Sequence, residues 1–110
     1  MNVNDLQRSA GQAAELMKAL SSENRLLLLC QLAEGDKTVG ELAAALGLRQ
    51  AAVSQQLALL RKDGLVAARR DGRSMHYSLT ASEARAVILL LHRLYCEPAK
   101  AMALTEQTGA

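Results

Sequence analysis

Large aromatic side chains are almost absent from this sequence. Its 110 residues include no phenylalanine and no tryptophan, and the aromatic residues are Tyr77 and Tyr95. A core without them must be built from Leu, Ala, Val and Met, which favours packed helices. Half of the residues are apolar and 22% are charged, which excludes a disordered chain. The length predicts one domain, residues 1–110.

Long hydrophobic runs and clustered cysteines are also missing. No apolar run approaches the roughly 20 residues of a membrane-spanning helix, and the Met1 end lacks the core of a signal peptide. We therefore expect a soluble cytoplasmic protein with no membrane partner. Cys30 and Cys96 are 66 positions apart, which matches no common zinc spacing. In a reducing cytosol both are expected to start as thiols.

The positive charge is small but unevenly distributed. A net charge of +2 does not by itself imply a nucleic-acid partner. Between Arg61 and Arg73, however, five basic residues accompany only two acidic ones. A local basic segment of this kind is a candidate contact for phosphates.

Helical spacing and capping signals divide the chain into elements. Residues 5–20 predict a first helix, and Ser21 or Ser22 can cap a second one that ends before Gly35. Thr38 and Glu41 form a capping box for a third helix at about 39–46, which stops at Gly47. A fourth helix spans roughly 50–62 and stops at Gly64.

The pattern changes after the fourth helix. Two extended arms surround Asp71-Gly72, a strong hairpin signal. Thr80 and Glu83 suggest another capping box, which would open a last helix at about 81–96, with Pro98 shortly after its end. The predicted fold is mainly α (α+β): a winged helix-turn-helix of four helices, a β-hairpin and a fifth helix. The terminal helices, about 5–20 and 81–96, remain available to join a homodimer.

The fourth helix has an unusual exposed face. At 100° per residue, Val53, Leu57 and Leu60 share the core side. The opposite side is small, polar and free of carboxylates, with Ala51, Ser54, Gln55, Ala58 and Lys62. Such a face suits the major groove, where a glutamine can pair with adenine and carboxylates would repel phosphates. For this helix alone an ordinary amphipathic surface helix is an equal explanation; the capped helix before it and the basic hairpin after it favour DNA.

The hairpin supplies candidate phosphate contacts. Arg69, Arg70 and Arg73 lie on or beside the Asp-Gly turn, where they could neutralise phosphates independently of base sequence. The alternative is that charged side chains on an edge strand prevent aggregation, and one or two of these arginines could do only that.

Three segments resemble the ArsR/SmtB family of dimeric bacterial repressors. They are ALSSENRLLLLCQL, TVGELAAALGLRQAAVSQQLALLRKDGLVAARRDGRSMHYSL and the last helix, together about residues 17–97. The resemblance implies a homodimer on a two-fold symmetric double-stranded operator, released by an inducer. Gln50, Ser54 and Gln55 match recognition-helix positions, and Arg73 matches the wing tip. Arg49 stands where many members have a Ser or Thr cap, which weakens capping but adds a cation that can reach phosphate.

The family resemblance also bears on what is sensed. Many members bind metal through cysteines near the third helix, and others through Asp and His on the last helix; neither pattern is present, so no metal and no cofactor are expected. Cys30 and Cys96 resemble the pair of the BigR/SqrR-type persulfide sensors. The resemblance implies that sulfur bridges these two thiols and releases the operator. A response to peroxide or to a thiophilic metal ion is the alternative.

The chemistry of two thiols is independent of the family. A thiolate attacks an electrophilic sulfur and a second thiol resolves the product. His92, one turn before Cys96, could favour its thiolate, although a surface histidine is the simpler explanation. Buried cysteines are also ordinary small core residues, and for Cys30 alone that reading is the stronger one.

Two other function classes are disfavoured. A protein-binding winged helix would expose an apolar recognition face. A thiol oxidoreductase would show Cys-x-x-Cys at a helix start, and this chain does not. The sequence therefore predicts a DNA-binding repressor and no enzyme.

Overall fold

The computed structural model describes residues 2–97, and the elements follow the predicted order. They are α1 (Val3–Ala19), α2 (Glu23–Glu34), β1 (Lys37–Thr38), α3 (Val39–Leu46), α4 (Gln50–Lys62), β2 (Val66–Asp71), β3 (Ser74–Leu79) and α5 (Ser82–Tyr95). The mainly helical winged helix-turn-helix is confirmed. Pro98 lies outside the described residues.

Local capping sets the helix-turn-helix. The Thr38 hydroxyl accepts the Glu41 N–H at 3.1 Å, while the Glu41 carboxylate accepts the Thr38 N–H at 2.9 Å, so the predicted capping box is present. Gly47 ends α3 with φ of 65°, a left-handed conformation that glycine adopts without steric cost. This residue turns the chain into α4.

The second predicted capping box is wrong. Ala81 is the N-cap of α5 and makes no side-chain capping bond. The Thr80 hydroxyl donates instead to the Leu65 carbonyl at 3.3 Å, and the Thr80 N–H bonds to the same oxygen at 3.0 Å. Thr80 therefore closes the base of the hairpin, a tertiary use of the hydroxyl that competes with helix capping.

The hairpin belongs to a three-stranded antiparallel sheet of order β1-β3-β2. Asp71 pairs with Ser74, so Gly72 and Arg73 form the two-residue loop at the tip. Gly72 has φ of 64°, which the tight turn requires. The short strand β1 was not predicted, because two residues show no alternation that could reveal a strand.

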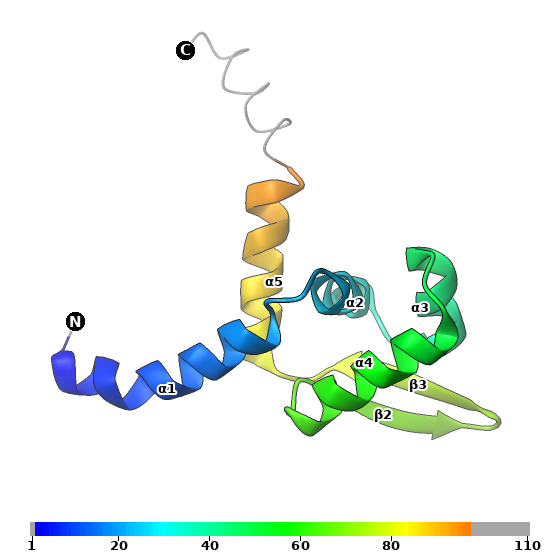
Figure 1. Cartoon of the computed structure of the whole chain (residues 1–110), viewed down its shortest axis with the longest axis horizontal. Helices are drawn as coiled ribbons and strands as arrows, with labels where there is room; N and C mark the ends of the chain where they lie inside the picture. Colours follow the sequence, from blue (N-terminus) through cyan, green and yellow to red (C-terminus); the bar gives the residue numbers. More distant parts are fainter. Residues whose placement is uncertain (1, 98–110) are drawn as a thin grey trace, which may run out of the picture.

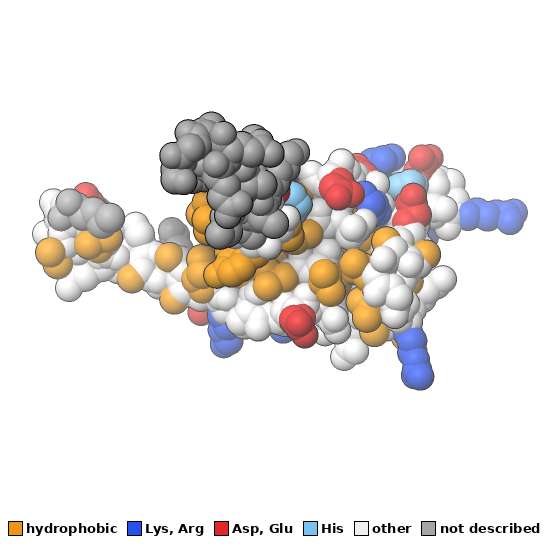
Figure 2. All heavy atoms as spheres, turned by 90° about the horizontal axis from the view of Figure 1, so that it is seen from above, with side chains coloured by type: hydrophobic (Ala, Val, Ile, Leu, Met, Phe, Trp, Pro, Cys, Tyr) orange, Lys and Arg blue, Asp and Glu red, His pale blue; other side chains and the backbone are white. Residues whose placement is uncertain are grey.

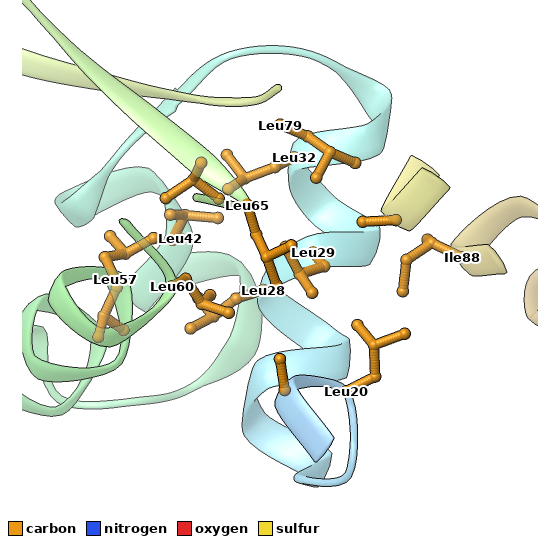
Figure 3. Close-up of a cluster of buried hydrophobic side chains, with 14 of the residues drawn as sticks. Leu20, Leu28, Leu29, Leu32, Leu42, Leu57, Leu60, Leu65, Leu79 and Ile88 are labelled. Atoms are coloured by element: carbon orange, nitrogen blue, oxygen red, sulfur yellow. The ribbon is translucent and has the colours of Figure 1, made fainter. Parts of the chain in front are cut away.

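Leucine is the commonest residue of the core, which also contains alanine, valine and isoleucine. Leu28, Leu29 and Leu32 of α2 lie at its centre and are at most 1% exposed. Figure 3 shows leucines of α3 and α4 on one side of α2, Ile88 of α5 on the other, and Leu79 of β3 beside Leu32. Burying one such side chain contributes roughly 1.5–3 kcal/mol. The central position of α2 means that any movement of this helix disturbs both α4 and α5.

The two terminal helices project away from the reading head, which we define as α3, α4 and the wing (β2 and β3). Figure 1 shows α1 and α5 on one side of α2, with α3, α4 and the wing on the other. Within residues 2–97, no helix combines the length and apolar character that crossing a bilayer requires.

Candidate DNA-binding surface and thiol pair

The outer face of α4 is exposed, as the helical spacing predicts. Val53, Leu57 and Leu60 are 0% exposed and hold the helix against the core. The opposite face points to solvent and carries the predicted Ala51, Ser54, Gln55, Ala58 and Lys62, together with Leu59, which is 41% exposed. This face can approach another surface closely and offers a hydroxyl and an amide as hydrogen-bonding groups.

Gln56, the neighbour of Gln55, has a different environment. Its side-chain oxygen accepts a hydrogen bond from Arg25 Nε at 3.1 Å, and Arg25 also donates to the Ala19 carbonyl at 3.3 Å. Arg25 of α2 thus links the last turn of α1 to the middle of α4. Local sequence patterns do not reveal this link, because Arg25 and Gln56 are 31 positions apart.

The start of α4 carries the two other predicted contact residues. Arg49 is the N-cap residue, is exposed, and makes no side-chain capping bond. Its guanidinium is therefore not used to hold the helix end. The amide of Gln50 lies close to Gly40 in α3, at the corner of the helix-turn-helix.

The three wing arginines differ in their surroundings. Arg73 lies in the exposed tip loop and Arg70 near the end of β2. Arg69 lies 3.9 Å from the carboxylates of both Asp36 and Asp71. Arg69 is therefore partly neutralised by its neighbours, whereas no ion pair within 4 Å involves Arg70 or Arg73 among the described residues. Figure 2 shows Lys and Arg side chains projecting from the end of the molecule away from α1.

The two cysteines lie on different helices. Cys30 of α2 is half-buried against the core, and Cys96 is the exposed C-cap residue of α5. Burial raises the pKa of the Cys30 thiol, and the neighbouring Cys96 thiol and Glu34 carboxylate raise it further. The two predicted thiols thus lie on helices that pack against each other, with Cys96 exposed and Cys30 half-buried.

His92 lies against a carboxylate. Its Nδ1 is 3.4 Å from Glu97 Oε1, and both side chains are about half exposed. The influence of His92 on Cys96 stays a prediction. Among residues 2–97, no three His, Cys, Asp or Glu side chains gather as a metal site would need.

A capped helix-turn-helix with a small polar outer face, followed by a basic two-stranded wing, defines a winged-helix DNA-binding protein. Similarity to known proteins identifies the family within this class. The model of the bacterial regulatory protein, arsR family, matches residues 22–68, and the chain belongs to this family.

Characterised relatives cover nearly the whole chain. The transcriptional activator HlyU of Vibrio cholerae is 44% identical over 88% of this chain and 90% of its own. The biofilm growth-associated repressor of Xylella fastidiosa is 38% identical over 91% and 88%. The protein is accordingly a BigR-like transcriptional regulator and not an enzyme.

Solved structures of both relatives share the fold. The repressor BigR from Xylella fastidiosa has a TM-score of 0.82 at 38% identity, covering 87% of this chain and 98% of its own. Reduced HlyU from Vibrio cholerae has a TM-score of 0.80 at 44% identity, covering 86% and 99%. A further neighbour, the homodimeric winged helix-turn-helix domain of Mb0332 from Mycobacterium bovis, has a TM-score of 0.71 at 30% identity, covering 88% and 91%.

Proposed function

We propose that this regulator is a repressor that binds its operator in the reduced state and leaves it when sulfane sulfur bridges Cys30 and Cys96. The observation that carries the proposal is the placement of the thiols. Cys30 lies on α2, which packs against α4, and Cys96 lies at the end of α5. A covalent link between them constrains the helix that supports α4.

The DNA contacts are proposed from exposure and chemistry. Gln50, Ser54 and Gln55 would read base edges, while the cations would hold phosphates. The cations are Arg49, Lys62, Arg69, Arg70 and Arg73. The Xylella relative carries the name repressor and the Vibrio cholerae relative the name activator. We propose repression, because a protein bound to its operator excludes other proteins from that DNA.

A homodimer is part of the same proposal. Large apolar side chains remain exposed on the terminal helices, namely Val3, Leu6 and Met17 on α1 and Leu89, Leu90, Leu94 and Tyr95 on α5. Figure 2 shows hydrophobic side chains gathered along α1 and around the base of α5. Contiguous exposed apolar surface of this kind marks an interface, and the Mycobacterium bovis neighbour is described as homodimeric.

The proposed bridging reaction uses a polysulfide as oxidant. A thiolate, here that of the accessible Cys96, attacks a sulfane sulfur, displaces a shorter sulfide and becomes a persulfide. The Cys30 thiolate then attacks Cys96 Sγ, the Sγ–S bond of the persulfide breaks, and the outer sulfur leaves as hydrosulfide with the electron pair. The product is a bridge between α2 and α5; attack on a longer chain leaves additional sulfur atoms in it.

The dimer converts a small change into a large loss of affinity. Two recognition helices must lie one helical turn of DNA apart, about 34–36 Å. A bridge that changes the angle between subunits removes several contacts together. The affinity for the operator can fall only by as much as the bridge is more stable in the free protein than in the DNA-bound protein.

Fluorescence anisotropy of labelled operator DNA tests this proposal. Polysulfide is expected to release the wild-type protein, while Cys30→Ser and Cys96→Ser proteins stay bound. Peroxide, zinc and cadmium serve as parallel treatments for the alternative inducers. A single-cysteine variant that responds to polysulfide like the wild type would refute the bridge. If zinc or cadmium releases the DNA and polysulfide does not, the inducer is a metal ion and not sulfane sulfur.

A further inference from the structure

Arg85 of α5 joins three elements through one side chain. Its Nη1 donates to the Ala33 carbonyl in the last turn of α2 at 3.1 Å. Its Nη2 donates to the Leu79 carbonyl at the end of β3 at 3.2 Å. The side chain is partly buried, so these bonds are shielded from water more than surface contacts are. A rigid guanidinium fork fixes the relative position of the two carbonyls.

The end of α2 that Arg85 holds is the end that carries Cys30. Ala33 is one helical turn beyond Cys30, and the last carbonyls of a helix have no partner within the helix. The neighbouring Gln31 carbonyl accepts from Lys37 Nζ at 3.1 Å, and Lys37 pairs with Tyr77 of β3. The last turn of α2 is therefore tied to the wing on both sides, by β1 and by Arg85.

The wing amplifies any change at its base. β3 has six residues, Ser74–Leu79, with Leu79 at the base beside α5 and Arg73 beyond the far end. At about 3.3 Å per residue the tip lies roughly 20 Å from the base. A tilt of about 10° would then move the tip by about 3 Å, enough to break a hydrogen bond to phosphate.

We propose that Arg85 is a positioning residue that sets the wing against α2 and α5, and so passes the arrangement of the thiol-bearing helices to the DNA-binding arginines. The inference rests on the proposed function, because it assumes that the wing contacts DNA. Thr80 also bonds at the base of the wing, but its hydroxyl reaches only the Leu65 carbonyl, directly before β2. Arg85 is distinct because its second bond reaches α2.

A double-mutant cycle with reduced protein and operator DNA tests the inference without the sulfur switch. Arg70→Ala and Gln55→Ala are measured in the wild-type and the Arg85→Gln backgrounds. We expect the affinity loss caused by Arg70→Ala to shrink by at least about threefold in the Arg85→Gln background. The loss caused by Gln55→Ala is expected to stay the same within about twofold, because the side-chain hydrogen bonds of Arg85 go to Ala33 and Leu79 and none goes to α4.

Arg25→Gln is the matched control. Arg25 is also a partly buried arginine of the α2 junction, but it bonds Gln56 and the Ala19 carbonyl and not the wing. We expect Arg25→Gln to change the affinity loss caused by Gln55→Ala and to leave the loss caused by Arg70→Ala unchanged. This is the reverse of the result expected for Arg85→Gln. Arg85→Lys, which keeps a donor but cannot fork, is expected to show part of the coupling and provides the test if Arg85→Gln does not fold.

The outcomes separate this inference from the proposed function. If Arg70→Ala and Gln55→Ala leave wild-type affinity unchanged, the proposed DNA surface is wrong and the inference falls with it. If both weaken binding but combine additively with Arg85→Gln and with Arg85→Lys, the surface stands and Arg85 only stabilises the fold. As a second readout, the factor by which polysulfide lowers operator affinity is expected to be smaller in Arg85→Gln than in the wild type.

Discussion

Adjacent residues of one helix can have separate roles, and Gln55 and Gln56 illustrate this at the residue scale. Gln55 was placed on the outer face by its 100° spacing from the core residues. The same spacing predicts no role for Gln56, because its partner Arg25 lies on another helix. Periodicity indicates which face a residue occupies, but it does not indicate which side chain from a distant segment meets it.

Replacement of Gln55 by alanine is expected to lower affinity for the cognate operator more than for unrelated DNA. A base-edge contact is worth about 1–3 kcal/mol, while phosphate contacts are unaffected. Gln56→Ala is the matched control, since it removes the bond to Arg25 and is expected to lower the free energy of unfolding. Competition binding with cognate and scrambled duplexes measures the effect. Unchanged discrimination in Gln55→Ala would show that α4 does not read bases there.

The two thiols are expected to differ in reactivity toward iodoacetamide. Burial, the Cys96 thiol and Glu34 raise the pKa of Cys30, so its reactive thiolate is scarce at neutral pH. Peptide mass spectrometry of the reduced protein is expected to show slower labelling of Cys30 than of the exposed Cys96. Labelling of Cys30 should keep rising with pH beyond the ordinary thiol range.

The same pKa shift has a consequence for stability. The unfolded chain releases the Cys30 proton at a lower pH than the folded chain does. The contribution of Cys30 to the free energy of unfolding is therefore fully present below the ordinary thiol pKa. It is lost as the pH rises through the raised pKa of the folded protein. Denatured protein, in which both cysteines label alike, is the control for the labelling experiment. Equal labelling of both cysteines in the folded protein at neutral pH would contradict a sheltered Cys30.

At the scale of elements, local signals predicted the helix-turn-helix well. The bounds of α3 and α4 agree with the predicted 39–46 and 50–62, because Thr38 with Glu41 and Gly47 act within a few residues of the helix ends they fix. The predicted capping role of Thr80 is wrong for the opposite reason, since its hydroxyl bonds to the Leu65 carbonyl, 15 positions away. The fold could thus be predicted where capping and spacing are local, and not where tertiary bonds compete.

The same limit applies to the candidate site. The outer face of α4 and the positions of the wing arginines followed from spacing and turn chemistry. Arg85 could not be found, because its bond to Ala33 spans 52 positions. The pairing of Cys30 with Cys96 is implied by family resemblance alone, since the two residues lie on different helices and sequence spacing does not show how those helices pack.

The wing arginines are expected to differ in their electrostatic contribution to binding. Arg70→Ala and Arg73→Ala should each reduce the slope of log affinity against log salt by about 1, because each removes one phosphate contact. Arg69→Ala should change the slope less, since Asp36 and Asp71 already compensate its charge. Titrations of the same operator at several salt concentrations measure the slopes. If Arg69→Ala reduced the slope more than Arg70→Ala and Arg73→Ala do, Arg69 would be the main phosphate contact of the wing.

At the scale of the whole molecule, the exposed apolar residues of α1 and α5 predict a dimer. Sedimentation velocity at micromolar concentration is expected to show one species of twice the 11.8 kDa chain mass. Leu94→Glu should shift it toward monomer, because Leu94 is an exposed leucine of α5. Leu59→Glu is the matched control, since Leu59 is equally an exposed leucine but belongs to the reading head. A wild-type protein that stays monomeric and binds a single half-site tightly would show that dimerisation is not needed for DNA binding.

The most direct test follows bridging and DNA release in one sample. Wild-type protein bound to labelled operator is titrated with polysulfide, and each point is measured by anisotropy and, after quenching of free thiols, by intact mass. The account predicts that the released fraction rises in step with the fraction of chains in which Cys30 and Cys96 are linked. Fully bridged protein that remains on the DNA, or DNA that is released while both thiols are still free, would contradict it.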